Sequence, residues 1–334
     1  MNKFNHIYIE SNLINTPKAD AILKHFTNAN IIEINHYKDI FNRNHQDFSK
    51  QKEHPALILA EKKGELLYEG AKVCQSFGNS HFYYTSLIMN CIYGCEYCYL
   101  SGMYPSANIV MFLNYEDYFL EVERYLAIHP MYICISYDTD LLALNSITGF
   151  LNKWIEFTDS HENLTIEIRT KCGNLASILD SIASLEHPER IIFAYTISPR
   201  EIVEKYEAHT SSLDTRVEAI TRLQSMGMTC RIAFDPMIYI PGWRQAYEDM
   251  AAFVFSEIDS SKLLDISIGT FRISKEYVKA MRKAYPASSI AQFPYSCVDE
   301  VYQYPDDIMR DMEDFMEEKC LTHISKDKIF RWEE

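Results

Sequence analysis

The chain of 334 residues has no apolar run long enough to cross a membrane, because a spanning helix needs about 20 consecutive apolar residues. Its first residues, Met-Asn-Lys-Phe-Asn-His, lack the apolar core of a secretory signal. No fixed repeat or low-complexity tract stands out, and a hydrophobic fraction of 47% argues against disorder. We therefore expect one large folded enzyme, a monomer without membrane attachment.

Positive charge is scarce as well. Lys and Arg number 32 against 47 Asp and Glu, which gives a net charge of −15 at pH 7. That sign is wrong for a protein that coats nucleic acid non-specifically, since such binding rests on Lys and Arg at phosphates. Any contact with nucleic acid would have to use a locally basic surface.

A disulfide framework is also absent. The nine cysteines are an odd number without paired spacing, and they fit a reducing cytoplasm better than an oxidised scaffold. Three of them form the run Cys91-Ile-Tyr-Gly-Cys95-Glu-Tyr-Cys98, with C-x-x-x-C-x-x-C spacing. Three thiolates on one short loop can hold three irons of a four-iron, four-sulfur (4Fe-4S) cluster. The missing fourth thiolate would leave one iron open for a small molecule.

Two other interpretations of this run remain open. A zinc loop completed by a distant Cys or His would use the same soft thiolates. A zinc ribbon normally brings a second C-x-x-C pair, however, and the sequence contains none. A single C-x-x-C pair can also be a redox dithiol.

Strand and helix patterns alternate along the chain, which implies an α/β fold with a parallel sheet and right-handed crossovers. We expect a small N-terminal α/β domain over residues 1–80, a partial (β/α)6 TIM-like barrel over 81–290, and a C-terminal aromatic hairpin and helix extension over 291–334. The barrel strands are expected at 83–89, 131–137, 165–170, 190–197, 229–234 and 264–270.

The helices between these strands are expected at 114–127, 145–158, 175–184, 213–226, 243–256 and 275–284. In the N-terminal domain we expect strands at 6–10, 31–34 and 56–61, a helix from Pro17, and a polar loop over 42–54. Sites in such folds lie at the carboxyl ends of the strands. The cysteine run directly follows the first barrel strand, where this rule places the chemistry.

The cysteine run, with an aromatic residue just before its third cysteine, resembles the signature of the radical SAM enzymes. Further segments resemble spore photoproduct lyase. They are Cys95-Glu-Tyr-Cys98-Tyr-Leu100, Tyr115-Glu-Asp-Tyr-Phe119, Asp140-Leu-Leu-Ala-Leu-Asn-Ser-Ile-Thr148 and the segments at 169–171, 196–200, 207–216, 235–238, 242–243 and 269–272. The resemblance covers residues 80–290 and, more weakly, the N-terminal domain.

This resemblance implies DNA repair in the spore core of an endospore-forming bacterium, a cytoplasmic location. The substrate would be UV-damaged DNA that contains 5-thyminyl-5,6-dihydrothymine, two thymines bridged by one methylene. A 5′-deoxyadenosyl radical, made from S-adenosylmethionine (SAM) at a 4Fe-4S cluster, would abstract the C6 hydrogen. The bridging bond would then fragment, and hydrogen donation would complete two thymines. The electron would come from a partner such as flavodoxin or ferredoxin.

Two other functions stay open at the level of sequence. One is a radical SAM enzyme of the same lineage that acts on a different small molecule or protein. The other is a non-catalytic module that binds zinc through the cysteine run.

The resemblance also assigns roles to individual residues, namely cluster ligation (Cys91, Cys95, Cys98), SAM binding (Thr139, Lys171, Ser198, Asp235) and radical return (Tyr97, Tyr99). Lys171 is expected at the SAM carboxylate, and Asp235 at the adenine end. Each SAM-binding residue also has a simpler interpretation. Lys171 could be a surface lysine at a strand end, Thr139 and Ser198 helix caps, and Asp235 the start of a turn.

The hydrogen donor is where the chain departs from the family pattern. The best-known branch has a cysteine at the end of the second strand, and this chain has Tyr137 there. Cys134 lies three residues earlier, so strand alternation predicts that it points to the opposite face as a core residue. We expect Cys74 to be the donor instead, with Cys172 as a third option.

Contacts with DNA are expected from Arg272, Tyr295 and Tyr302. Arg272, together with Arg200, Arg216 and Lys275, falls near predicted strand ends or the following helices and could meet phosphates. The aromatic stretch at 293–304 could wedge into a duplex or stack on an extruded base. Packing of this stretch against the open barrel is an equal alternative.

Overall fold

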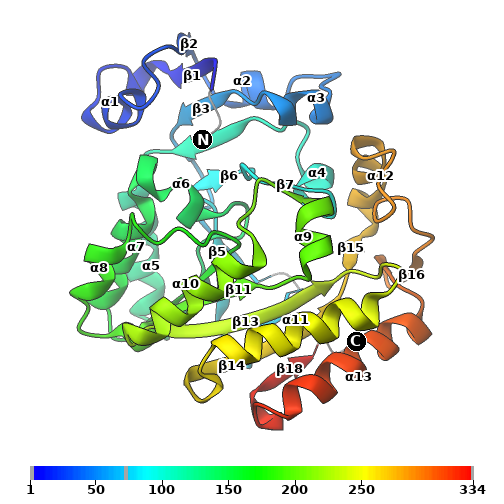
Figure 1. The fold of residues 1–334 in the computed structure, drawn as a ribbon. Coiled ribbons are helices and arrows are strands. Elements are labelled where there is room, and N and C mark those ends of the chain that lie inside the picture. Colours follow the sequence, from blue (N-terminus) through cyan, green and yellow to red (C-terminus); the bar gives the residue numbers. More distant parts are fainter. Residues whose placement is uncertain (1–3, 71–73, 332–334) are drawn as a thin grey trace.

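The structure, a computed structural model, describes residues 4–70 and 74–331. Its centre is a curved eight-stranded sheet whose strands run in the order β18-β14-β13-β11-β10-β9-β5-β4 (Figure 1). Six of these are the predicted barrel strands, β5 (Phe82–Thr85), β9 (Met131–Cys134), β10 (Leu164–Thr170), β11 (Ile191–Thr196), β13 (Thr229–Met237) and β14 (Leu263–Thr270). Each pairs in parallel with its neighbour, which confirms a partial barrel.

Two short strands extend the barrel sheet at its edges. The strand β18 (Ile329–Arg331), near the C-terminus, pairs in parallel with β14. At the other edge β4 (Leu67–Glu69) runs antiparallel to β5. The sheet therefore has two more strands than the six expected, and one of them comes from the C-terminal extension.

Helices line the periphery of this curved sheet (Figure 1). They are α5 (Tyr115–Leu126), α6 (Leu141–Thr148), α7 (Phe150–Asp159), α8 (Leu179–Ala183), α9 (Arg200–Tyr206), α10 (Leu213–Ser225), α11 (Trp243–Glu257), α12 (Lys275–Ala284) and α13 (Asp306–Leu321). The helix expected over 145–158 is two helices. Gly149 separates them because its positive φ of 64° is left-handed and ends the first helix. The helix α9 was not expected at all.

The N-terminal domain contains a second sheet, of five strands in the order β2-β1-β3-β8-β6. Its first three strands are those expected, β1 (His6–Glu10), β2 (Asn30–Ile34) and β3 (Leu57–Ala60). The other two, β8 (Ile109–Phe112) and β6 (Ile88–Met89), come from beyond residue 80. The single strand expected over 83–89 is therefore divided between two sheets, and the cysteine run starts from the N-terminal one.

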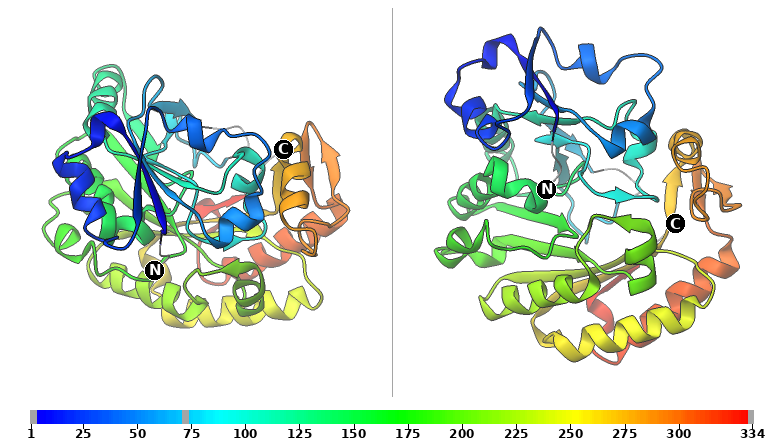
Figure 2. Two further views of the ribbon diagram at one scale, coloured as in Figure 1. Left: turned by 90° about the horizontal axis from the view of Figure 1, so that it is seen from above. Right: turned by 45° about the horizontal axis from the view of Figure 1, so that its top comes forward.

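Part of the segment expected to be a polar loop is helical. It contains α3 (Phe48–Glu53), whose first turn is capped by Asp47, which accepts a hydrogen bond from the Lys50 amide at 3.2 Å. The helices α1 (Pro17–Leu23) and α2 (Lys38–Phe41) complete the domain. Figure 2 shows α12 beside the N-terminal elements, and the Ser49 hydroxyl of α3 donates to the Ala284 carbonyl of α12 at 2.6 Å.

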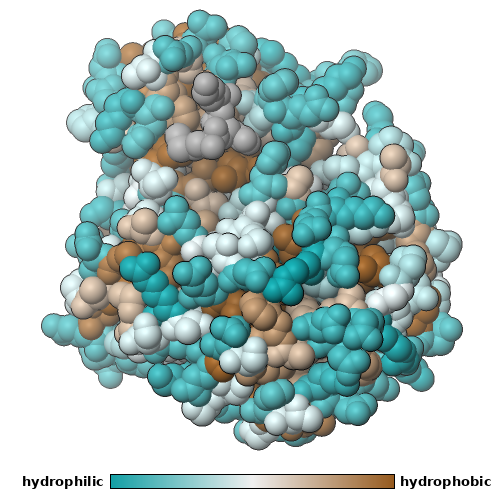
Figure 3. Space-filling view, in the orientation of Figure 1, coloured by the Kyte–Doolittle hydropathy of each residue, from teal (hydrophilic) through white to brown (hydrophobic). Residues whose placement is uncertain are grey.

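The C-terminal extension forms the expected hairpin from β16 (Ser296–Val298) and β17 (Val301–Gln303). The strand β17 also pairs with β15 (Arg272–Ser274), which follows the last barrel strand. Hydrophilic residues cover much of the face in Figure 3, with hydrophobic residues in separate spots between them. Within the described residues, no helix combines the length and the apolar composition needed to cross a membrane.

Candidate active site

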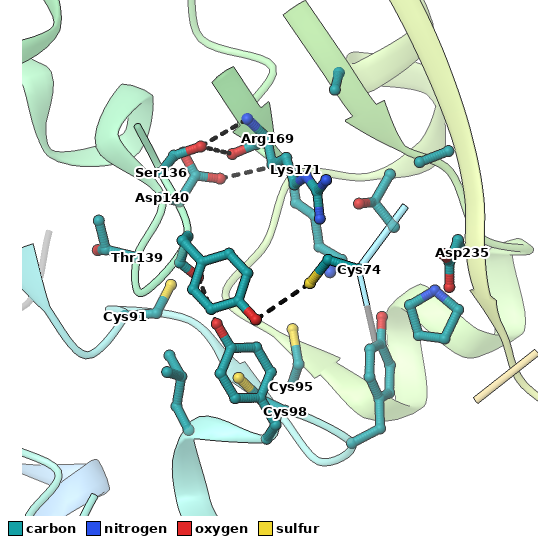
Figure 4. A pocket seen from close by; sticks show the side chains of 18 of the residues that line it. Cys74, Cys91, Cys95, Cys98, Ser136, Thr139, Asp140, Arg169, Lys171 and Asp235 are labelled. Carbon is teal, nitrogen blue, oxygen red and sulfur yellow. Dashed lines mark hydrogen bonds between the residues drawn. The ribbon is translucent and has the colours of Figure 1, made fainter. Parts of the chain in front are cut away.

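A cavity of about 570 Å³ lies at the carboxyl ends of the barrel strands. The cysteine run forms one wall, and residues at the ends of β9, β10, β11 and β13 form the others. The labelled side chains of Cys91, Cys95, Cys98, Thr139 and Lys171 surround one space in Figure 4. Residues that are far apart in sequence therefore meet at the edge of the sheet where such folds place their chemistry.

The three cysteines of the run all line this cavity as free thiols. Cys95 lies in the short strand β7 (Gly94–Cys95), which pairs antiparallel with β12 (Glu207–Ala208). On the other side, Lys52 of α3 donates a hydrogen bond to the backbone carbonyl of Cys91. The barrel and the N-terminal domain thus hold the loop from both ends.

Burial favours the protonated form of two of these thiols. It raises the pKa of Cys91 to about 11 and that of Cys95 further still. Metal binding requires thiolates and releases the protons of the thiols. The cysteines would therefore become negatively charged only when the metal binds. Among the described residues, no group of three or more His, Cys, Asp and Glu side chains converges on a single metal ion, whereas the thiolates that hold a 4Fe-4S cluster each bind a different iron.

Two predicted SAM-binding residues face the cavity with available polar groups. Thr139 is 9% exposed, and its hydroxyl oxygen has no hydrogen-bond partner within the part of the chain that the structure describes. The ammonium of Lys171 lies 5.3 Å from the centre of the Tyr97 ring. Burial alone would lower the pKa of Lys171, but Cys95 and Glu207 raise it overall. An orphaned hydroxyl and a cation suit a polar, anionic ligand.

Asp140 explains why these two residues lie together. Its carboxylate caps α6 by accepting from the Ala143 amide at 3.1 Å. The same carboxylate accepts from the Thr170 hydroxyl at 2.9 Å and from the Lys171 amide at 2.8 Å. One buried side chain therefore fixes the end of β10 against the loop that carries Thr139.

Ser198 does not line the cavity. Its hydroxyl donates to Glu207 at 2.8 Å, and its residue is 1% exposed. Glu207 also accepts from Tyr97 and forms an ion pair with Arg216, whose side chain is fully buried. The expectation that Arg216 meets DNA phosphates is therefore wrong, because its charge is neutralised inside the protein.

Asp235 and Arg272 both line the cavity and bind each other. The two guanidinium nitrogens donate to the two carboxylate oxygens at 2.9 and 3.0 Å, a bidentate pair. Gly269 allows this approach, since a Cβ there would lie 2.9 Å from an Arg272 nitrogen. The predicted substrate arginine is thus brought to the predicted cofactor residue.

Cys74 also lines the cavity, and its sulfur lies 3.2 Å from the phenol oxygen of Tyr137. Tyr99 donates a hydrogen bond to the backbone carbonyl of Tyr137 at 2.7 Å. The structure therefore places the expected hydrogen donor and one expected radical-return tyrosine around the same residue, Tyr137.

The other two cysteine options are outside the cavity lining. Cys134 is fully buried in a cluster against which Cys74 and Tyr137 also pack. The strand-alternation argument for Cys134 does not apply, because β9 ends at Cys134 and does not continue to residue 137. Its predicted role as a core residue agrees with its burial. Cys172 is 7% exposed, with its sulfur 3.8 Å from the Asn174 carbonyl.

The two aromatic residues expected at the substrate do not reach the cavity. Tyr295 is 7% exposed, donates to the Ile290 carbonyl at 2.8 Å and packs 5.1 Å from the Phe271 ring. Tyr302 lies on β17, outside the residues that line the cavity. For Tyr295, packing against the barrel is what the structure shows.

Sequence reasoning missed the charged floor of the cavity. Glu167 accepts hydrogen bonds from Tyr132, Arg169 and Arg231, and Arg231 also binds Asp265 at 2.7 Å. Burial alone would raise the pKa of Glu167, but Arg169 and Arg231 lower it overall. Alternate charges at 167 and 169 of β10, followed by Lys171 just after its end, were a usable signal, because alternate residues of a strand share a face.

Comparison with known proteins decides the family. The family model described as "Spore photoproduct lyase" matches residues 3–330. The chain belongs to the spore photoproduct lyase family. The resemblance inferred from the sequence is therefore confirmed.

Individual relatives agree with this assignment. A spore photoproduct lyase of Clostridium acetobutylicum is 21% identical over 350 residues, covering 98% of each chain. One from Bacillus subtilis is 22% identical over 301 residues, covering 85% of this chain and 83% of its own.

Two solved structures share the fold of the chain. One is a spore photoproduct lyase in complex with dinucleoside spore photoproduct, with a TM-score of 0.80, 18% identity and 98% coverage of both chains. The other is a variant with bound AdoMet and dinucleoside spore photoproduct, with a TM-score of 0.81 and 19% identity. That alignment covers 99% of this chain and 98% of the other.

Proposed function

We propose that this member of the family is a radical SAM lyase that returns the spore photoproduct in DNA to two thymines. The observation that carries the proposal is the meeting of three kinds of group in one cavity. These are the three-cysteine run, the available polar groups of Thr139 and Lys171, and the separate thiol of Cys74.

The residues present fit a 4Fe-4S cluster and SAM. Cys91, Cys95 and Cys98 would hold the cluster, since three thiolates and one open iron are what such a site requires. When bound, these groups would supply the radical chemistry that removes a hydrogen atom from C6 of the photoproduct. The electron for this chemistry would come from a flavodoxin or a ferredoxin.

The chain's own side chains would bind and orient SAM. Lys171 is half-buried and carries a positive charge suited to the carboxylate, and the Thr139 hydroxyl supplies a hydrogen bond that nothing in the described residues takes up. Asp235, fixed by Arg272, would line the adenine end. Ser198 would act only indirectly, because its hydroxyl binds Glu207.

The Cys74 thiol would complete the reaction. After the bridging bond breaks, one thymine carries an unpaired electron on its methylene carbon. The S–H bond of Cys74 would break and a C–H bond would form at that carbon, giving the thymine methyl group and leaving the unpaired electron on sulfur. Cys74 lines the cavity, as a donor must.

Tyr97 and Tyr99 would return the radical. Burial and nearby acidic groups raise the pKa of both phenols well above the ordinary value of 10. Each phenol therefore keeps its proton and can exchange a whole hydrogen atom rather than a proton alone. Both lie on the wall that carries the cluster cysteines.

Binding to DNA would be weak and sensitive to salt. The net charge is −15, and the candidate phosphate contacts Arg200 and Lys275 pair at the surface with Asp214 and Glu300. Recognition would then rest on the damaged dinucleotide inside the cavity. We expect the protein to act as a monomer.

A second candidate is the same radical chemistry on another substrate, a small molecule or a protein. Two observations favour it, the acidic net charge and the presence of Tyr137 where the best-known branch has its cysteine. In this second candidate, the residues that would bind the cluster and SAM keep their roles. Cys74 would not donate hydrogen to a thymine radical, and no thymine would be formed.

The test uses anaerobically reconstituted protein, SAM, dithionite and the synthetic dinucleotide photoproduct. We expect wild type to release thymidylyl-thymidine and to cleave SAM to 5′-deoxyadenosine. The Cys98→Ala variant should do neither. The exposed Cys297→Ala variant is the matched control and should retain both. Cofactor cleavage without thymidylyl-thymidine would instead favour the second candidate.

A further inference from the structure

Tyr137 is held rigidly beside Cys74. Its ring stacks on Tyr84 with centroids 4.3 Å apart, and its backbone carbonyl accepts the Tyr99 hydroxyl at 2.7 Å. Its phenol oxygen reaches the Cys74 sulfur at 3.2 Å, the contact marked by the dashed line to Cys74 in Figure 4. The phenol is thus fixed from two sides while its oxygen points at the thiol.

Cys74 itself has little local support. It lies within residues 74–81, which contain no helix or strand. The side-chain amide of the neighbouring Gln75 donates to the Arg331 carbonyl at 3.0 Å, which ties this segment to β18. Among the described residues, only Tyr137 forms a hydrogen bond with the Cys74 side chain. The direction of the thiol therefore depends on Tyr137.

We propose that Tyr137 is a positioning residue for Cys74, donating its O–H to the sulfur so that the S–H bond points into the cavity. The inference rests on the proposed lyase function, in which Cys74 gives its hydrogen to the thymine radical. A thiol is a weak donor and a weak acceptor, and a phenol is the stronger donor of the pair. With sulfur as acceptor, its single hydrogen stays available to the substrate.

The surroundings keep the phenol in the required state. Burial, followed by the adjacent Cys74, raises the pKa of Tyr137, so the phenol stays protonated and able to donate. Tyr137 occupies the position of the donor cysteine of the best-known branch, and here it would orient the donor Cys74, which lies on a different segment. It would orient the hydrogen without supplying it.

Removal of the hydroxyl separates this role from a structural one. Tyr137→Phe keeps the ring that stacks on Tyr84 but leaves the thiol free to rotate. Loss of photoproduct, which reports bond cleavage, should continue near the wild-type rate. The ratio of abnormal adducts to thymidylyl-thymidine should rise roughly two- to tenfold, the effect of one neutral hydrogen bond. A general packing defect would slow both the cleavage of the bridging bond and the donation of hydrogen.

The matched control is Tyr68→Phe. Tyr68 stacks on Tyr84 at 5.1 Å in the same row of rings, but its hydroxyl donates to the Glu65 carbonyl and not to Cys74. It also lies outside the residues that line the cavity. This variant should leave the product ratio at the wild-type value.

A spectroscopic readout tests the contact without turnover. The infrared S–H band of Cys74 is isolated as wild type minus Cys74→Ala in anaerobic, cluster-loaded protein. Tyr137→Phe should shift and broaden this band, and Tyr68→Phe should leave it in place. An unchanged band overturns the proposed contact, and a shifted band with an unchanged product ratio overturns the positioning role. If wild type repairs no photoproduct, the lyase function fails, and the band alone decides the contact.

Discussion

The phenol of Tyr97 donates its hydrogen bond to Glu207, the carboxylate that also neutralises the fully buried guanidinium of Arg216. The backbone of Glu207 pairs in turn with Cys95 in the two-residue ladder of β7 and β12. One buried acid therefore joins the cysteine run to the fourth barrel strand and its following helices. This arrangement makes the stability of the fold and the geometry of the site depend on the same residue.

Replacement of Glu207 should destabilise the protein strongly. Glu207→Gln leaves the Arg216 charge buried without its counter-ion, which typically costs about 3–5 kcal/mol. We expect that loss in the free energy of unfolding, measured by urea denaturation of the apo protein. The comparison is Asp214→Asn, which breaks the exposed Arg200–Asp214 pair and should cost about 0–1 kcal/mol. Equal losses in the two variants would contradict the buried network.

The effect of Glu207→Gln should also depend on pH. Burial alone would raise the pKa of Glu207, but Lys171 and Arg216 hold it below its ordinary value of 4.5. A lowered pKa means that the folded state binds this proton less tightly than the unfolded chain. The stabilisation is therefore complete above about pH 4.5 and is lost as the pH falls through the folded-state value.

The measurement is the difference in unfolding free energy between wild type and Glu207→Gln from pH 6 to pH 3. We expect the difference to shrink toward acid, because protonation of Glu207 removes the charge that the variant already lacks. Other carboxylates are common to both proteins and cancel in the comparison. A difference that grows toward acid would have the wrong sign for this account.

Lys171 should determine the affinity for SAM. Loss of a hydrogen bond to a charged group is worth about 1.5–3 kcal/mol, so Lys171→Met should raise the dissociation constant about 10- to 100-fold. Equilibrium dialysis of cluster-loaded protein with labelled SAM measures this directly. Lys205→Met removes a lysine that lies exposed on α9 and should bind SAM as wild type does. Identical affinities for the two variants would remove Lys171 from the cofactor site.

The two cysteines near Tyr137 should differ in what they control. Cys74→Ala should still consume the photoproduct but should yield abnormal adducts in place of most thymidylyl-thymidine, because the hydrogen donor is missing. Cys134→Ala removes a fully buried core side chain, so it should lower stability by about 1 kcal/mol and leave the product unchanged. Mass spectrometry of the products from both variants checks this. The reverse pattern would assign the donor role to Cys134.

The sequence predicted the parts of the fold that depend on local pattern. The six barrel strands follow runs of apolar residues, and α12 has the predicted bounds, Lys275–Ala284. The cysteine run could be found because its spacing is local. The pairing of β8 with β3 could not be found, since it brings Ile109–Phe112 beside residues about 50 positions earlier.

The site was predictable to the same extent. Thr139, Lys171 and Asp235 were expected at strand ends, where topology alone gathers side chains, and all three line the cavity. The link from Ser198 to Glu207 depends on side-chain directions that only the folded structure fixes. The burial of Cys134 was expected, but the argument from strand alternation failed because the strand ends three residues earlier than expected.

The most direct test is the mass of the product formed in heavy water. Wild-type protein, pre-equilibrated in D2O with its cluster, SAM and reductant, is given the unlabelled dinucleotide photoproduct under single-turnover conditions. A donor thiol exchanges its hydrogen with solvent, so the account predicts thymidylyl-thymidine carrying one deuterium in a thymine methyl group. Cys74→Ala should not form this species. Absence of thymidylyl-thymidine from wild type, despite cleavage of SAM, would contradict the proposed function.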